Sequence, residues 1–119
     1  MAEQGGLTVN LDERIRAAVL PVVPVCEPDF YEGDAEIYCT FNVNEMPTSF
    51  GDDAPRHMRC FVQLHLFAPG WPKPPSTRSL RRELCRAVLA AGFTYPEVTD
   101  ASEKETQHYV LEFEGVEEA

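Results

Sequence analysis

The side chains in this sequence that are best suited to chemistry are four cysteines and three histidines. A catalytic thiol needs a neighbouring base that a third group orients, and a structural zinc ion is usually held by close pairs of Cys or His ligands. The cysteines are widely spread and form no Cys-x-x-Cys pair, so their spacing favours neither kind of site. These residues are Cys26, Cys39, Cys60, Cys85, His57, His65 and His108.

Strand parity also argues against a cysteine enzyme. Successive side chains of an extended strand point to opposite faces, which places Cys60 and His65 on opposite faces of their strand. Cys39 and Cys60 could instead meet across adjacent strands in the core, where a thiol stays protonated and inert. We therefore expect four reduced thiols, at least two of them in the core, and no disulfide framework.

Asp52 and Asp53 suggest a carboxylate pair or a cation site. Without a third oxygen-rich position the signal is weak, and acidic residues are common in turns. The sequence also lacks the glycine-rich phosphate loops, the Gly-x-Ser-x-Gly elbow and the His-Glu-x-x-His zinc motif. We therefore expect a protein that is not an enzyme and that needs no cofactor or metal.

Three groups of residues suit contacts with other proteins. Trp71 lies in a proline-rich segment, where a rigid aromatic side chain loses little entropy on docking; it would equally serve as a lid over the end of the core. A second predicted loop has an apolar tip, and apolar loop tips often dock into partners. Three arginines follow one another at four-residue steps along a predicted helix. The candidate interface residues are Met46, Pro47, Phe50, Asp52, Asp53, Trp71, Arg78, Arg82 and Arg86.

The charge of the chain is unevenly distributed. Twenty acidic and ten basic side chains give a net charge of −10, which argues against binding to a nucleic-acid backbone. The segment 56–86 nevertheless holds seven cations and one acid, a charge of +6, which leaves −16 for the rest. A molecule with a basic strip and acidic flanks can attract its own copies head to tail. A solvated helix face accounts for the arginines equally well.

Apolar periodicity predicts the first helix over 7–20. Asn10, followed three positions later by a glutamate, resembles a capping box, with Thr8 as the alternative cap. Pro21 should end this helix by driving Leu20 out of the α region.

The second predicted helix runs from a Ser76 cap to Ala91, with Gly92 in the left-handed position that follows it. Its apolar stripe is Leu80, Leu84, Ala87, Val88 and Ala91.

Alternating and β-branched segments predict the strands, and clusters of Gly, Pro and Asp predict the loops. The strand 56–67 has one apolar face and one half-aromatic face, which a helix or a neighbouring subunit would cover. The expected strands are 22–26 (an edge strand or extended arm), 35–42, 56–67, 93–100 and 106–116, and the expected irregular segments are 29–34, 44–55 and 68–75.

These elements predict an α+β fold, a mostly antiparallel sheet of four to five strands packed against two helices. At 119 residues we expect a single domain over 1–119, with 1–6 frayed. No run of apolar residues is long enough to cross a membrane. The N-terminus lacks the basic and apolar stretches of a signal peptide, so we expect the protein to stay in the compartment where it is made.

The chain resembles the tail terminator (tail completion) proteins of long-tailed bacteriophages, the minor tail proteins of the lambda type. The resemblance runs from Arg14 to about Glu114. It rests on a "PVVPV" segment after the first helix, a "HMRCFVQLHLF" strand, a helix ending at Ala90–Phe93 and a closing "ETQHYVLEFE" strand.

This resemblance implies a ring, usually hexameric, that terminates the tail tube and joins it to the head. The partners would be copies of the same chain, the tail tube protein and a head or neck connector protein. DNA would pass through without specific binding, and no membrane would be involved. The protein would be made in the cytoplasm of the bacterial host and reside in the virion at the head–tail junction.

The resemblance also gives roles to the charges. The basic helix would meet acidic flanks of the next subunit, and the acidic excess would line a lumen that repels phosphate. Two alternatives remain open at this point: a phage head-completion or neck adaptor, and a small module that binds a host protein.

Overall fold

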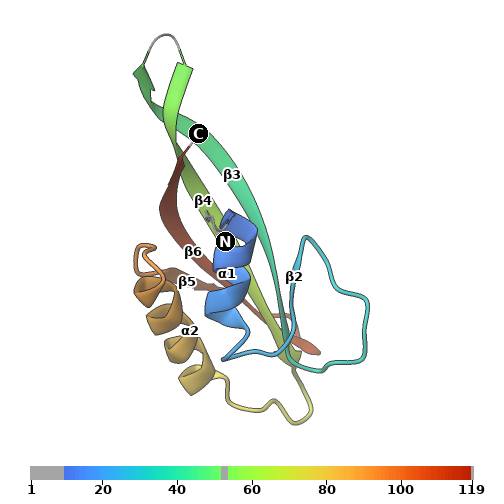
Figure 1. Cartoon of the computed structure of the whole chain (residues 1–119). Helices are drawn as coiled ribbons and strands as arrows, with labels where there is room; N and C mark the ends of the chain where they lie inside the picture. Colours follow the sequence, from blue (N-terminus) through green and yellow to red (C-terminus); the bar gives the residue numbers. More distant parts are fainter. Residues whose placement is uncertain (1–9, 52–53, 119) are drawn as a thin grey trace.

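The computed structural model describes residues 10–51 and 54–118, of which 48–51, 54–56 and 118 are described by their backbone alone. Two helices and five strands follow one another in the order that the sequence predicts (Figure 1). The elements are α1 (Leu11–Val19), β2 (Cys26–Pro28), β3 (Tyr38–Gly51), β4 (Ala54–Pro69), α2 (Arg78–Ala90), β5 (Glu97–Asp100) and β6 (Thr106–Glu118).

The five strands form one mixed sheet in the spatial order β2-β3-β4-β6-β5. Only β2 is parallel to its neighbour, and the other three pairings are antiparallel. β4 lies at the centre and pairs along nearly its whole length with β3 and β6. The predicted α+β class with a mostly antiparallel sheet and two helices is therefore confirmed.

Both helices pack against the same face of the sheet (Figure 1). The alternation predicted for β4 is confirmed, because its apolar face is buried beneath them while the other face stays partly exposed. The suggestion that a helix covers this second face is wrong. The buried core comprises Leu11, Ile15, Val19, Val23, Cys26, Cys39, Phe41, Cys60, Val62, Leu64, Leu66, Leu84, Cys85, Val88, Phe93, Leu111 and Phe113.

The start of α1 follows the predicted capping box. The Glu13 backbone N–H donates to Asn10 Oδ1 at 2.9 Å, and Asn10 Nδ2 donates to the Glu13 carboxylate at 2.7 Å. Asn10 is thus the N-cap, and the predicted helix start at Leu7 and the alternative cap Thr8 lie outside the described residues. This cap satisfies one of the otherwise unpaired N–H groups of the first turn.

The end of α1 corrects one expectation. Leu20 keeps α-helical angles (φ −56°, ψ −36°), and its N–H bonds to the Arg16 carbonyl, so Pro21 does not drive it out of the α region. The preference against α geometry before proline is modest, and this hydrogen bond offsets it. The helix still ends here, since Pro21 has no N–H to continue the ladder.

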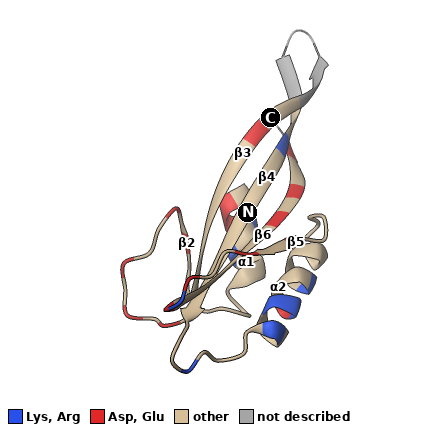
Figure 2. Cartoon of the chain, turned by 180° about the vertical axis from the view of Figure 1, so that it is seen from behind, with Lys and Arg blue, Asp and Glu red and all other residues tan. Residues whose placement is uncertain are grey.

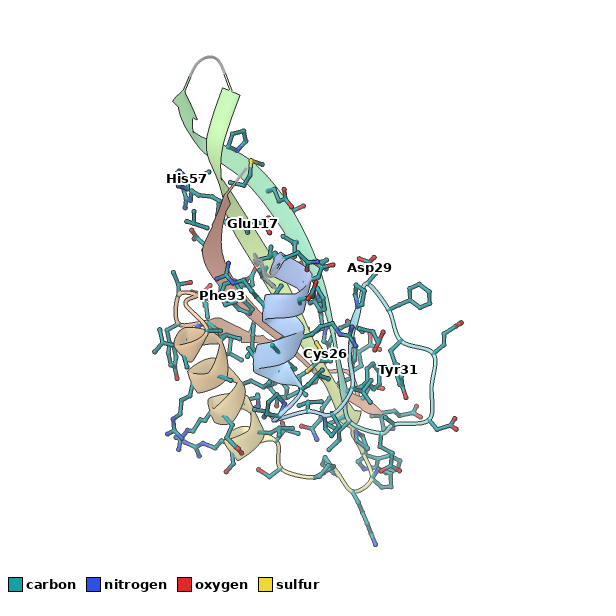
Figure 3. All side chains as sticks on the ribbon, in the orientation of Figure 1. Cys26, Asp29, Tyr31, His57, Phe93 and Glu117 are labelled. Atoms are coloured by element: carbon teal, nitrogen blue, oxygen red, sulfur yellow. The ribbon has the colours of Figure 1, made fainter. Side chains whose placement is uncertain are left out.

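Contacts with Glu117 and Phe93, two residues far from α1 in the sequence, fix the position of α1 on the sheet. The Leu11 N–H donates to a Glu117 carboxylate oxygen at 3.0 Å, and the Arg14 guanidinium lies 4.6 Å from the centre of the Phe93 ring. Figure 3 shows Phe93 and Glu117 beside α1. The helix is therefore held along both its core face and its flank.

α2 begins one residue later than predicted. Its N-cap is Thr77, not Ser76, and Thr77 makes no side-chain capping bond. Its hydroxyl instead donates to Gln107 Oε1 at 3.0 Å and accepts from Arg81 Nε at 3.2 Å, which ties the helix start to β6. Gly92 has φ 98°, the predicted left-handed position, where glycine carries no steric penalty. Neither helix in the described part of the chain is long and apolar enough to cross a membrane.

The described residues of the segment 44–55, which was predicted as a long loop, form the far half of a β-hairpin. β3 continues to Gly51 and β4 starts at Ala54, with Met46 opposite Arg59 and Pro47 opposite Met58. The register shifts on either side of Ser49, which accommodates the irregularity that Pro and Gly introduce. Pairing with a strong central strand therefore overrides the local loop signals.

Other boundaries move by a few residues. β2 replaces the expected strand 22–26 but keeps its predicted place at a sheet edge. β3 starts at Tyr38, so the loop after β2 is longer than the predicted turn 29–34. Ala68 and Pro69, expected in the proline-rich linker, are paired with β6. β5 starts at Glu97 rather than at 93.

We predict that Asn10 and Ser76, the two residues expected from the sequence to be caps, differ in their contribution to stability. Asn10→Ala should lower the free energy of unfolding by about 1 kcal/mol, since it removes the bond to the Glu13 N–H. Ser76→Ala should change it by less than about 0.5 kcal/mol, because Ser76 is exposed and caps nothing. Urea titrations of the two variants measure the difference, and equal losses would contradict the capping assignment.

Candidate functional site

All four cysteines are free and buried. Cys26 and Cys39 are register partners across β2 and β3, whereas Cys39 faces Leu66 and Cys60 faces Glu45 across β3 and β4. The suggested meeting of Cys39 with Cys60 is therefore wrong, because the hairpin register places Cys60 farther along β3.

The environment of these thiols leaves them unreactive. Burial raises the pKa of Cys26 to about 12 and outweighs the opposite effect of Arg16. Burial also raises the pKa of Cys39, and the neighbouring Cys26 adds to the rise. The pKa values of Cys60 and Cys85 are raised as well, again chiefly by burial. A thiolate nucleophile is thus disfavoured at every cysteine.

The uncovered face of the sheet carries a row of aromatic rings. Tyr38, Phe67 and His108 are cross-strand neighbours on β3, β4 and β6. Their ring centroids are 5.0 Å and 4.3 Å apart, and Tyr31 extends the row at 4.7 Å from Tyr38. Such offset contacts stabilise the sheet beyond the area they bury. The side chains remain partly exposed.

His108, one ring of this row, contacts a second histidine, His65. His65 Nδ1 lies 2.8 Å from His108 Nε2, and Asn42 Nδ2 lies 3.4 Å from the other nitrogen of His65. One ring must donate and the other accept, so at least one of the two is neutral. Burial lowers the pKa of both histidines, and the proximity of His108 lowers that of His65 further. In the described ranges no three His, Cys, Asp or Glu side chains converge as metal ligands.

Two open hollows contain polar groups that already have partners. One, of about 430 Å³ on the uncovered face, contains Glu112, which accepts from Gln63 Nε2 at 3.1 Å, and Glu114, which is 2.6 Å from Arg59. The other, of about 500 Å³, lies between the proline-rich linker and β6. Neither hollow brings a cysteine together with a histidine.

The predicted interface residues fall in separate places. Met46 is 54% exposed, and Pro47 is also exposed; both lie on β3, not at a loop tip. The side chain of Phe50 and the whole of Asp52 and Asp53 lie outside the described residues. The hairpin and the linker that holds Trp71 are at opposite ends of the molecule (Figure 1).

Trp71 is 61% exposed, and Lys104 Nζ lies 4.7 Å from the centre of its ring. The alternative role as a lid over the core is therefore wrong. A cation against the ring face steadies an exposed aromatic side chain, which keeps Trp71 as a candidate contact residue.

The arginines of α2 lie where periodicity predicted. Arg78, Arg82 and Arg86 are exposed on the side opposite the buried Leu84 and Val88. Within the described residues none of the three forms an ion pair. This strip of positive charge is therefore available to a partner.

A second charged surface was missed in the sequence, where 29–34 was interpreted only as a turn and Glu36 was placed in a strand. The loop between β2 and β3 carries Asp29, Glu32, Asp34 and Glu36, all exposed, with Phe30 beside them 68% exposed. Figure 2 shows these acids on the opposite side of the molecule from the basic residues of α2. The density of four acids in eight residues around an aromatic side chain was the signal that could have identified it.

No known protein family matches this chain, and no curated protein matches its sequence.

We predict that the four thiols are protected in the native state. Alkylation at neutral pH should be slow before unfolding and complete in denaturant, because the sulfurs are buried and protonated. Mass spectrometry counts the labels, and Ser76→Cys, at an exposed position, provides a fast-reacting reference. A native cysteine that reacts as fast as this introduced thiol would contradict the burial.

We also predict that the histidine pair makes stability depend on pH. The folded state holds both pKa values below the usual 6.5, so the unfolded chain binds more protons as the pH falls through that value. The free energy of unfolding should therefore fall between about pH 7 and pH 5.5. A variant with His65→Gln and His108→Gln should show a shallower fall in denaturant titrations. An unchanged slope would contradict the pair's contribution.

Proposed function

We propose that the chain is the ring subunit of a tail terminator of a long-tailed bacteriophage. Copies of it, six in the simplest ring, would close on the end of the tail tube and join the tube to the head. Its place would be the head–tail junction of the virion. The fold agrees with what the sequence resemblance implies, an antiparallel sheet with two helices on it.

The observation that carries this proposal is the long uncovered edge of β3. β2 pairs with β3 only from Cys39 to Phe41, and in the described part of the chain no strand pairs with its outer edge from Asn42 to Gly51. The far end of this hairpin extends beyond the helices (Figure 1). A protein that functions alone usually shortens or covers such an edge. Its length here supports a role in assembly.

The chemistry of this edge favours a defined contact over open-ended strand pairing. Pro47 removes a backbone donor, and the register shift that follows interrupts the ladder. Met46 offers a flexible apolar side chain that adapts to a partner surface. We assign the hairpin to contact with the end of the tail tube or with the connector of the head.

The charge supports the same role. A net charge of −10 on each copy would give the ring a strongly acidic surface. Phosphate groups would be repelled from an acidic lumen, so that DNA could slide through without sticking. The buried, protonated thiols also suit a structural part, since they offer no reactive group.

We predict a closed ring in solution or on tube ends. Native mass spectrometry across protein and magnesium concentrations should show a species near 80 kDa, about six times the 13.4 kDa chain. When added to tail tube protein that is elongating in vitro, the chain should bind tube ends and shorten the tubes.

Each alternative gives a different result. A neck adaptor would bind the connector and leave tube length unchanged. A host-binding module would stay monomeric and form a stoichiometric complex with one host protein. A chain that stays monomeric and leaves tube length unchanged would contradict the terminator role.

A further inference from the structure

We propose that neighbouring copies in the ring associate head to tail, with the basic face of α2 on one copy docked against the acidic loop of the next. The basic face comprises Arg78, Arg82, Arg86 and Leu89; the acidic loop is the segment 29–37 between β2 and β3. This inference rests on the proposed ring and identifies the surfaces that close it.

The basic face is an unpartnered strip on a rigid helix. The three arginines recur every four residues and span about 12 Å along the axis. Leu89, three positions after Arg86, falls on the same side and is 50% exposed. Glu83 is the one acidic residue of α2. An exposed apolar side chain among three guanidinium groups is typical of a contact surface, in which aliphatic and charged groups act together.

The acidic loop has the complementary composition. It presents four exposed carboxylates around Phe30, which is itself 68% exposed. Three positive charges and one apolar side chain on one surface thus match four negative charges and one apolar side chain on the other.

The acidic loop is also held in a fixed shape before any contact. The Tyr31 ring packs against Tyr38 in a tilted contact, with the ring centroids 4.7 Å apart, and the Tyr31 hydroxyl accepts from the Ala35 N–H at 3.0 Å. At its start, the Asp29 N–H donates to the Phe41 carbonyl at 2.9 Å. Figure 3 shows Asp29 and Tyr31 on this loop at the β2 edge of the sheet. A preorganised loop loses less entropy on docking, which strengthens association.

The position of the two surfaces selects the kind of assembly. They lie on opposite sides of the molecule, the acidic loop at the β2 edge and α2 on the side of β5 (Figure 2). A contact between unlike surfaces repeats from copy to copy and closes into a ring when the rotation allows it. A two-fold dimer through either surface would place like charges together, which opposes that alternative.

Charge reversal of each surface separately tests the contact. The helix variant carries Arg78→Glu, Arg82→Glu and Arg86→Glu; the loop variant carries Glu32→Lys, Asp34→Lys and Glu36→Lys. All six positions are exposed, so circular dichroism should show intact folds. Each variant alone presents like charges at the contact and should need at least about a tenfold higher concentration to assemble. Lys73→Glu and Glu105→Lys, at exposed positions outside both surfaces, each reverse one charge and should assemble like the original chain.

A mixture of the helix variant and the loop variant tests directly whether the two surfaces contact each other. The helix variant has two acidic surfaces and the loop variant has two basic ones, so the two should alternate around an even-numbered ring. An equimolar mixture should therefore recover the original mass, and a chain with all six reversals should recover it alone. Added salt should weaken assembly of the original chain by screening the contact.

The outcomes separate this inference from the proposed function. Suppose that the original chain forms the ring. If the single-surface variants then form it equally well, or if their mixture recovers no ring, the proposed contact is overturned and the terminator role stands. An original chain that assembles neither alone nor on tube ends would overturn both.

Discussion

Burial of one face of β4 beneath both helices is the interaction on which the rest of the structure depends. Cys60, Val62, Leu64 and Leu66 are fully buried on that face, and β3 and β6 flank the strand along nearly its whole length. Because α1 and α2 occupy the same side, the other face is left with aromatic and polar side chains that are stabilised by cross-strand contacts and by Tyr31 of the loop after β2. The layered arrangement thus leaves an uncovered sheet face and two sheet edges for contacts with other molecules.

Those edges differ in both length and charge. One side of the sheet ends in the short β2, the acidic loop and the open far half of β3, and the other ends in β5 beside the arginines of α2. A molecule whose two sides are unlike and complementary favours repeating contacts over two-fold pairing. The proposed terminator ring and the proposed contact between α2 and the acidic loop follow from this asymmetry. The hairpin lies at one end of the molecule, where it would be left free for a partner along the axis of the proposed ring.

Sequence reasoning predicted the structure correctly where the pattern of neighbouring residues determines it, and failed where contacts between residues distant in the chain determine it. The alternation of 56–67 and the four-residue spacing of Arg78, Arg82 and Arg86 predicted buried and exposed positions that the fold confirms. The segment 44–55 was predicted as a loop because Pro47 and Gly51 are local strand breakers, yet its described residues belong to the paired strands β3 and β4. The acidic loop was interpreted as a simple turn, since nothing in the local pattern indicates what lies across the sheet from it.

The sequence by itself determined the α+β class, the order of the elements, the buried face of the central strand and the exposed arginines. It did so because helical and strand periodicities act over a few residues. Only the tertiary structure decided that both helices share one face of the sheet and that the acidic loop lies opposite α2. It also decided that the strand-register partner of Cys39 is Cys26 and not Cys60. These features depend on register and on packing between residues far apart in the chain, where a shift by one residue exchanges the faces of a strand.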